Sequence, residues 1–515
     1  MKTTLSLSLI ASTALLLSGC GGGGGSTGGG GGNSTTLKVS AGADRAAVTS
    51  SATRIVGTSN KSGTTYQWSE GGTDIPGATA ATLLYTPATA GAHTLTLTAT
   101  NGSDTVTDSV TLTAGSTAPT YRNLLVVRIN FADTSFQNDA PTWSAKIFGS
   151  AGGQLNDYYG ELSGGQFQFL PATESDGTQD GLIDVTLSPD HPADDSSDGS
   201  FRYWTVFKNA LSQIDSQVDF SSYDINNNGS IDAQELQIMF LVSGGETSTG
   251  WNPNQSIWGL KSCYSAPTTP PAPTLDGVTL MACSTGGNFS RFGERHKAGT
   301  TDHDATIGII AHELGHAAFG LPDLYDVDGA TGGIGMFGLM GAGSWARASA
   351  TQEAGETPVH MTAWSKIQAG FISPTIISGT TSATLHGTDT GSYNIYQVNT
   401  STPGEYYLVE NRPNSGYDKG LHALNNGSSF AGGLLVMHVD DAIPDNSGSP
   451  HRLVDVEEVA SPELDNTSGS NRGAVGNLFY GSNTGTLSAP YGGGTTPTVT
   501  AVSASGDPMT ATITP

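Results

Sequence analysis

The segment His312-Glu313-Leu314-Gly315-His316 carries the residues with the clearest chemistry in the chain. It matches the pattern H-E-x-x-H, in which the two histidines are four residues apart and therefore share one face of a helix. Both imidazoles can then bind a single Zn²⁺ ion. Glu313 lies about 100° round the helix, where it can take a proton from water at the metal. The pattern predicts a catalytic zinc site with Glu313 as the general base.

A helix from Thr306 to Phe319 must position this pattern, because that stretch is apolar on one side. Asp304 is the expected N-cap of the helix. Gly320 is placed as a C′ residue and Pro322 prevents continuation, so the chain turns sharply after the second histidine. The turn can bring a third zinc ligand back to the metal, and Asp323 is the first candidate.

The sequence Gly-Leu-Pro-Asp-Leu-Tyr-Asp at 320–326 resembles the immune inhibitor A family of secreted bacterial metallopeptidases, relatives of the metzincins. The resemblance extends over about residues 120–465 and implies an α/β metzincin-like zinc peptidase domain. Met340 resembles the methionine turn that underlies such zinc sites. Further segments that resemble the same family are, in chain order, Leu125–Asp133, Leu155–Tyr159, Ser163–Gly165, Val218–Asp224, Ser256–Trp258, Gly338–Trp345, Pro358–Trp364 with Lys366, Tyr407–Arg412, Gly433–Asp440 and His451–Asp455.

The spacing of the third ligand departs from the family pattern H-E-x-x-H-x-x-G-x-x-H/D. One extra residue precedes Gly320, so Asp323 falls seven rather than six residues after His316. Glycine can supply an unusual backbone angle that absorbs an extra residue in the turn. Asp323 is therefore the expected third ligand, and the downstream acids that remain open as alternatives are Asp326, Glu353 and Glu356.

A second metal signature occupies residues 224–235, which fit the twelve-residue calcium loop of EF-hands. Gly229 stands at loop position 6 and Ile231 is the apolar residue at position 8. With only three carboxylates, the loop should bind Ca²⁺ with the modest affinity of extracellular modules. The alternative is an Asn-rich turn without metal. The expected calcium ligands are Asp224, Asn226, Asn228, Ser230, Asp232 and Glu235.

The N-terminus predicts export and a lipid anchor. Residues 1–19 have a short basic start and an apolar stretch, as signal peptides do. Leu17-Ser18-Gly19-Cys20 resembles a bacterial lipobox, which implies acylation of Cys20. Gly at position 21 implies sorting to the outer membrane, so the expected location is an outer-membrane lipoprotein, surface-exposed or released to the medium. The alternative is an ordinary signal peptide.

The remaining chain divides into several regions. Residues 20–36 are a Gly-rich tether. Residues 37–115 alternate apolar and polar positions and predict an immunoglobulin-like or PKD-like β-sandwich, with a hairpin turn at Asn101-Gly102. The catalytic domain is expected at 120–380 and a β-rich C-terminal region at 381–515. The fold class is thus multidomain, with a β-sandwich before an α/β peptidase domain.

Two cysteines, Cys263 and Cys283, remain beyond the lipobox. An exported protein with an even pair predicts one disulfide, here closing a loop that contains Pro270, Pro271 and Pro273. The alternative is a pair of buried thiols.

Composition excludes several classes of protein. Acidic residues outnumber basic ones 46 to 20, and the net charge of −26 excludes the basic face that nucleic-acid binding requires. Seven tryptophans, 16 tyrosines and 16 phenylalanines argue against a long disordered chain. Gly is 70 of 515 residues, which suits a loop-rich exported protein that we expect to be monomeric.

Three functions remain after these exclusions. The first is a zinc endopeptidase that acts on extracellular protein or peptide substrates. The second is a non-catalytic surface adhesin that uses its β-rich modules. The third is a zinc hydrolase of another bond, such as an ester. The intact H-E-x-x-H pattern and the family resemblance favour the endopeptidase.

Overall fold

The computed structural model describes residues 37–515, apart from short gaps at 42–44, 49–52, 60, 62, 90, 116–119, 177, 179, 194–201, 267–268, 299–300, 426–430, 448–450, 460–463 and 465–470. The expected signal peptide, the tether and Cys20 therefore lie outside the described residues. Within the described part of the chain, we find no helix with the length and apolar character needed to cross a membrane.

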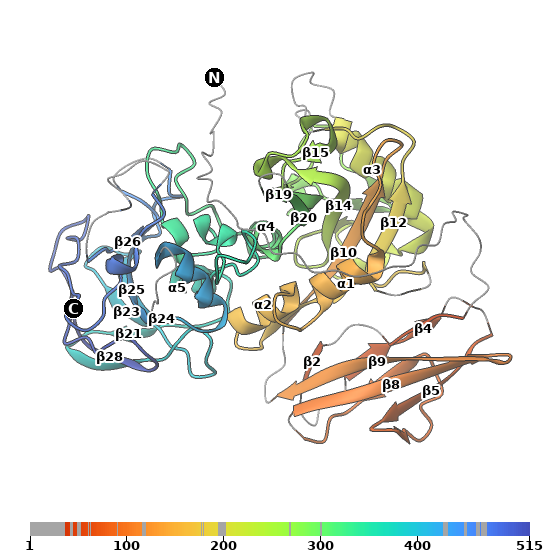
Figure 1. The fold of residues 1–515 in the computed structure, drawn as a ribbon, viewed down its shortest axis with the longest axis horizontal. Helices are drawn as coiled ribbons and strands as arrows, with labels where there is room; N and C mark the ends of the chain where they lie inside the picture. The colour runs from red at the N-terminus through yellow and green to blue at the C-terminus, as the bar shows by residue number, and fades with distance from the viewer. Residues whose placement is uncertain are drawn as a thin grey trace, which may run out of the picture. The chain divides into compact units, whose positions relative to one another are not determined.

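Between the gaps named above, the described residues of 37–115 form β-strands joined by turns (Figure 1). Strands β8 (Gly91–Asn101) and β9 (Asp104–Gly115) pair antiparallel across Asn101-Gly102, which confirms the predicted hairpin. They belong to a five-stranded sheet ordered β2-β9-β8-β5-β6, and Trp68 of β5 is fully buried in its core. The immunoglobulin or PKD arrangement stays a prediction. The other strands are β1 (Val39–Ser40), β2 (Arg45–Val48), β3 (Thr53–Val56), β4 (Thr58–Ser59), β5 (Thr65–Glu70), β6 (Thr73–Asp74) and β7 (Thr82–Tyr85).

An eight-stranded mixed sheet forms the centre of the next region, with the main order β11-β10-β14-β19-β16. Most neighbours are parallel, but β16 is antiparallel to β19 and forms the edge near the candidate site. The strands are β10 (Thr120–Asn130), β11 (Phe167–Pro171), β12 (Leu182–Thr186), β14 (Gln237–Glu246), β15 (Ser256–Ile257), β16 (Leu260–Ser262), β19 (Phe289–Ala298) and β20 (Thr301–Asp304).

Helices cover both faces of this sheet, because its central strands alternate their apolar side chains between two cores. In β10, Leu124 and Val126 enter the core beneath α1 (Ala140–Phe148), α2 (Leu155–Leu162) and α4 (Ile307–Phe319). Leu125 and Val127 enter the opposite core, which contains α3 (Arg202–Ile214). The expected α/β character of this region is confirmed.

Two further sheets follow the helix α5 (Ala363–Gln368). A five-stranded sheet has the order β21-β23-β24-β25-β26, and a three-stranded sheet has the order β22-β28-β27. Their strands are β21 (Thr375–Ile377), β22 (Thr381–Leu385), β23 (Tyr396–Asn399), β24 (Glu405–Pro413), β25 (Gly432–Asp440), β26 (Val454–Val456), β27 (Thr498–Thr500) and β28 (Met509–Thr514).

The five-stranded sheet shares one hydrophobic core with the helices of the α/β region. Leu408 of β24 and Met437 of β25 belong to the same buried cluster as Leu314 of α4. The alternate residues Tyr407 and Val436 belong to a separate core with the three-stranded sheet. Residues before and after the predicted domain boundary at position 380 therefore share one core.

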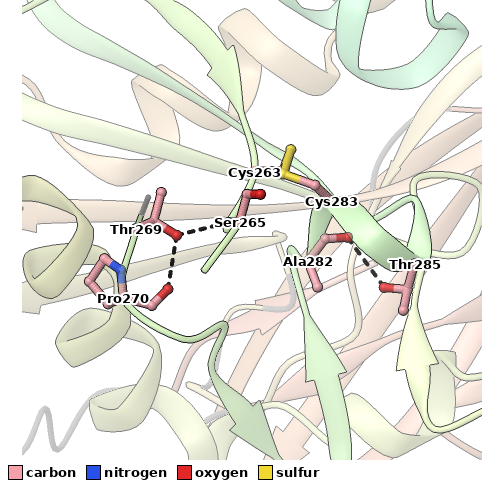
Figure 2. Close-up of a disulfide and its surroundings, with 7 residues drawn as sticks. All are labelled: Cys263, Ser265, Thr269, Pro270, Ala282, Cys283 and Thr285. Carbon is pink, nitrogen blue, oxygen red and sulfur yellow. Dashed lines mark hydrogen bonds between the residues drawn. A yellow bond between two sulfur atoms is a disulfide. The ribbon is translucent and has the colours of Figure 1, made fainter. Parts of the chain in front are cut away.

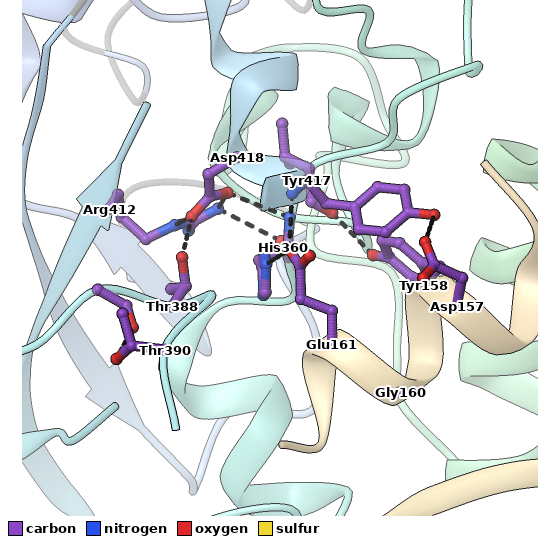
Figure 3. Close-up of polar contacts among 12 residues, drawn as sticks. Asp157, Tyr158, Gly160, Glu161, His360, Thr388, Thr390, Arg412, Tyr417 and Asp418 are labelled. Atoms are coloured by element: carbon purple, nitrogen blue, oxygen red, sulfur yellow. Dashed lines mark hydrogen bonds and ion pairs between the residues drawn. The ribbon is translucent and has the colours of Figure 1, made fainter. Parts of the chain in front are cut away.

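A buried polar network also links the two regions (Figure 3). Arg412 of β24 donates to Asp418 over 2.7 Å, and both side chains are fully buried. Asp418 also accepts from Thr388 over 2.6 Å and from the backbone N–H of His360 over 3.2 Å. The imidazole of His360 contacts Glu161 of α2 at 2.7 Å. The guanidinium of Arg412 thus stabilises a carboxylate that ties together three segments distant in sequence.

Cys263 and Cys283 form a disulfide with an S–S distance of 2.06 Å (Figure 2). Between them lies the hairpin of β17 (Thr274–Leu275) and β18 (Val278–Leu280). Strand β18 pairs with β13 (Ser230–Ile231), so the disulfide-closed segment is attached to the predicted calcium loop.

Replacing Arg412 with Ala should lower the free energy of unfolding by about 3–5 kcal/mol, because Asp418 would remain buried without its cationic partner. Urea unfolding followed by fluorescence measures this change. Lys61→Ala is the control: it breaks a more exposed ion pair with Asp104 and should cost less than about 1 kcal/mol. Equal losses in the two variants would contradict the structural role of the buried network.

Candidate active site

Helix α4 carries the H-E-x-x-H pattern across the sheet, and eleven of its thirteen residues are buried. It ends at Gly320, whose φ of 68° lies in the left-handed region that favours glycine. The N–H groups of Gly320 and Leu321 donate to carbonyls of the last helical turn. The predicted C-terminus of the helix is confirmed. The predicted N-cap is wrong, because Thr306 precedes the first helical residue and Asp304 belongs to β20.

The turn after Gly320 brings Asp323 to the two histidines. Asp323 Oδ1 lies 3.1 Å from His312 Nε2 and 3.1 Å from His316 Nε2, and the two Nε2 atoms are 3.2 Å apart. Ligand atoms about 2.0–2.1 Å from a tetrahedral Zn²⁺ ion would be separated by about 3.3–3.4 Å. The three side chains therefore fit one zinc ion as three of its ligands.

Each imidazole is oriented by a backbone carbonyl. His312 Nδ1 is 2.9 Å from the carbonyl oxygen of Leu339, and His316 Nδ1 contacts the carbonyl oxygen of Leu321. A carbonyl can only accept, so both Nδ1 atoms carry the hydrogen and donate it. This leaves the lone pair on Nε2, which is the tautomer that binds metal.

The electrostatics favour a cation at this point. Burial opposes ionisation of Asp323, but hydrogen bonds with the two histidines lower the pKa of its carboxyl well below the usual range. Burial likewise opposes protonation of His312, but Asp323 and Glu313 together raise its pKa. Carboxylates thus attract positive charge to the buried imidazoles, and a bound Zn²⁺ ion would supply that charge.

Met340 packs against α4 at Gly315, which lies between the two histidines in the sequence. It is fully buried, and a Cβ atom at Gly315 would lie only 2.7 Å from its sulfur. Gly315 therefore permits the close approach of Met340 to the helix between the two ligands. The backbone carbonyl of Met340 also accepts from Leu324 over 2.8 Å, which fixes the turn that follows Asp323.

Glu313 faces the edge strand of the sheet. Its Oε2 accepts the backbone N–H of Lys261 in β16 over 2.7 Å, and the side chain is only 7% exposed. Burial raises the pKa of this carboxyl. The strand therefore holds one oxygen of Glu313, a contact that the sequence does not indicate.

The alternative third ligands are not part of this group. Both carboxylate oxygens of Asp326 accept hydrogen bonds from Asp328 and Thr331 within their own loop. Glu353 lies 3.5 Å from His303, and Glu356 accepts the backbone N–H of Glu353. The structure brings Asp323 rather than these acids to the histidines.

Tyr325 is a neighbour of the site that we did not single out from sequence. Its ring is nearly parallel to the imidazole of His312, with centroids 6.2 Å apart and planes at 22°. Burial and the neighbouring carboxylate of Asp323 raise the pKa of its phenol well above the usual range. The signal available in the sequence was its position two residues after the third ligand.

In the predicted calcium loop, side-chain oxygens accept hydrogen bonds from backbone N–H groups of the same loop. Asp224 accepts the N–H groups of Asn228 and Gly229, each over 2.9 Å, and Glu235 accepts that of Ile225 over 3.0 Å. Asp232 accepts from Gln234 over 2.7 Å. Among the described residues, the acids of this loop do not form a group of ligand atoms within 4.8 Å of one another, as His312, His316 and Asp323 do. Asn226 Oδ1 and Asn228 Oδ1 likewise accept backbone N–H groups, and Ser230 lies in β13.

Two histidines and a carboxylate around one point are a ligand set of catalytic zinc sites. The class of protein that such a site indicates is a metal-dependent hydrolase. Residues 153–372 match the family model of the immune inhibitor A peptidase M6 catalytic domain. The match includes every residue of the site described above and supports a metallopeptidase that acts on proteins or peptides. The segment that matches the family model is shorter than the region of about residues 120–465 over which the sequence resembles the family.

Other comparisons add no functional information. No curated protein matches the chain. Among solved structures, a quinonprotein alcohol dehydrogenase-like protein from Bacteroides thetaiotaomicron is 19% identical, with 14% of this chain and 17% of that chain covered and a TM-score of 0.13. The titin domains z1z2 with telethonin are 20% identical, with 20% and 60% covered and a TM-score of 0.14. A sialyltransferase from Photobacterium damsela is 10% identical, with 41% and 44% covered and a TM-score of 0.13. The chain spans less than two thirds of each structure, and these low scores support no argument about fold.

Replacing Asp323 with Ala should reduce zinc affinity by about 100-fold or more, because the site loses one of its three ligands. Competition with a fluorescent chelator measures the affinity. Glu353→Ala and Glu356→Ala serve as controls and should leave the affinity unchanged. Loss of zinc binding in either control, with binding retained by Asp323→Ala, would assign the third ligand to that acid instead.

Proposed function

We propose that this protein is a zinc-dependent endopeptidase that hydrolyses peptide bonds of extracellular proteins. The observation that carries the proposal is the group formed by His312, His316 and Asp323 within a segment that matches a peptidase family. When bound there, Zn²⁺ would polarise the scissile carbonyl and acidify the attacking water. A buried helix with oriented imidazoles is suited to hold the ion in a fixed position.

Glu313 is proposed as the general base. The N–H of Lys261 holds Oε2, which leaves Oε1 to take a proton from the attacking water and pass it to the leaving amine. The raised pKa of the buried carboxyl suits this role, because a base is most effective when its pKa approaches the working pH.

Glu313→Gln should lower kcat by about 10²–10⁴-fold, because the amide cannot accept the proton. Casein and gelatin cleavage measure activity, and metal analysis should show an unchanged zinc content. Glu356→Gln makes the same chemical change at an exposed acid and should remain active.

Two outcomes would contradict the proposal. Full proteolysis by Glu313→Gln would exclude Glu313 as the base. Wild-type activity that survives o-phenanthroline, without recovery on adding Zn²⁺, would exclude zinc dependence.

We also propose a structural Ca²⁺ site at residues 224–235, supported by the EF-hand spacing and the left-handed Gly229. Millimolar Ca²⁺ should raise the Tm of the wild-type protein, since extracellular loops bind with dissociation constants of about 10⁻⁴–10⁻³ M. Asp224→Ala should remove the shift. An equal shift in this variant would place the binding elsewhere.

The proposed location is the bacterial outer membrane, through an acylated Cys20 that lies outside the described residues. The lipobox and the Gly-rich tether of the sequence support it. Membrane fractionation of the wild-type protein and a Cys20→Ser variant tests the anchor. Recovery of both proteins in the membrane fraction would contradict it.

A further inference from the structure

The edge strand β16 contacts Glu313, yet its own side chains hold it in place only weakly. Lys261 is exposed, and Leu260 and Ser262 are half-buried. The strand has three residues, lies at the edge of the sheet and pairs antiparallel with β19. A short segment with few buried side chains opens easily in a folded protein. The position of the Lys261 N–H against Glu313 therefore depends on what holds the ends of the strand.

The disulfide lies directly after this strand (Figure 2). Cys263 comes two residues after Lys261, or about 7 Å along an extended chain. Its partner Cys283 follows three residues that are all buried, Leu280, Met281 and Ala282. The disulfide thus ties the weakly held end of β16 to a segment that is fixed in a core.

Tyr264 attaches the same end of β16 without a covalent bond. Its ring is buried, and its hydroxyl donates to the carbonyl of Trp204 over 2.6 Å. Its backbone N–H donates to Met281 over 2.8 Å, and its carbonyl accepts the N–H of Cys283 over 3.0 Å. These contacts do not require the disulfide. Breaking the disulfide should therefore loosen β16 while the core stays folded.

The disulfide can be reached from solvent, because Cys283 is exposed and Cys263 is half-buried. Exposed disulfides exchange with thiols more easily than buried ones. A thiolate that attacks Cys283 Sγ forms a mixed disulfide, and Cys263 leaves as a thiolate that takes up a proton. A second thiol then releases Cys283 as a thiol. Two electrons pass from the two thiols to the protein, and the reductant leaves as its own disulfide.

We propose that the Cys263–Cys283 disulfide positions β16 for Glu313, and that its reduction by a low-molecular-weight thiol lowers peptidase activity. The inference rests on the proposed function. A loosened β16 no longer keeps the Lys261 N–H on Oε2 of Glu313, so Oε1 loses the orientation needed to accept a proton. The proposed zinc ligands lie on α4 and the turn after it and are unchanged. The protein is thus less active where thiols are abundant, as in the cytosol.

The test compares the oxidised wild-type protein with the same protein after treatment with reduced glutathione and desalting. Reduction should lower kcat by about 10-fold. KM should change by less than about 2-fold, and the zinc content should stay the same. Oxidised glutathione should restore kcat.

The matched control carries Cys263→Ser and Cys283→Ser together. It should have the kcat of the reduced wild-type protein and should not respond to glutathione. The control retains Cys20 and the proposed zinc ligands, so it also reports any effect of glutathione at those places. A loss of activity with glutathione that is equal in wild type and control would overturn the inference.

Lys261→Pro tests whether the effect passes through the contact with Glu313. Proline removes the N–H that Glu313 accepts, and an edge strand tolerates proline where that N–H points away from the sheet. The variant should have a lowered kcat, and reduction should lower it further by less than about 2-fold, because both changes act on one contact. A further 10-fold loss would show that the disulfide acts by another route.

Amide hydrogen exchange gives a measurement that does not depend on activity. After reduction of the wild-type protein, peptides that cover β16 should exchange faster, and peptides of α4 should exchange at the same rate. Unchanged exchange in β16 would overturn the inference. This measurement decides the result if the cysteine variants or Lys261→Pro do not fold.

The two failures are distinguishable. If the oxidised wild-type protein cleaves no peptide, the proposed function fails, and hydrogen exchange still decides whether the disulfide holds β16. If the oxidised and reduced proteins cleave peptides equally, or if activity falls only together with zinc content, the role of the disulfide is overturned and the peptidase remains.

Discussion

The candidate site depends on one constraint, the donation of both imidazole Nδ1–H groups to backbone carbonyls. His312 donates to Leu339 and His316 to Leu321, so both rings are fixed with Nε2 facing one point. Both acceptors lie after the helix in the chain. The site can therefore form only when the turn at Gly320 and the segment containing Met340 have packed against α4. The segment after α4 that contains Asp323 also supplies the two carbonyl groups that orient the histidines.

This requirement explains the extent of the shared core. The segment that follows the site packs under the five-stranded sheet, and Leu339 and Leu408 belong to one buried cluster. The ion pair of Arg412 and Asp418 also stabilises the contact between these two regions. Both side chains are buried, and either charge without its partner would destabilise the fold. The β-rich C-terminal region thus packs in the same core as helix α4 and helps to support it. We propose that it folds together with the catalytic region.

The edge of the central sheet contains both a contact with α4 and a residue exposed to solvent. Strand β16 presents a backbone N–H to Glu313 and continues from the exposed Trp258. A carboxylate held by a backbone N–H depends little on the identity of the side chain at Lys261.

The sequence by itself determined the features that local spacing controls. The four-residue interval of His312 and His316 fixed a helix face, and Gly320 with Pro322 fixed where the helix ends. Alternating apolar residues likewise located β8 and β9. Only the tertiary structure decided which acid lies against the two histidines, because the extra residue before Gly320 makes the path of the turn depend on contacts such as that of Leu324 with Met340. It also decided the contact of Glu313 with β16, since that pairing joins residues 52 positions apart and follows from the order of strands in the sheet.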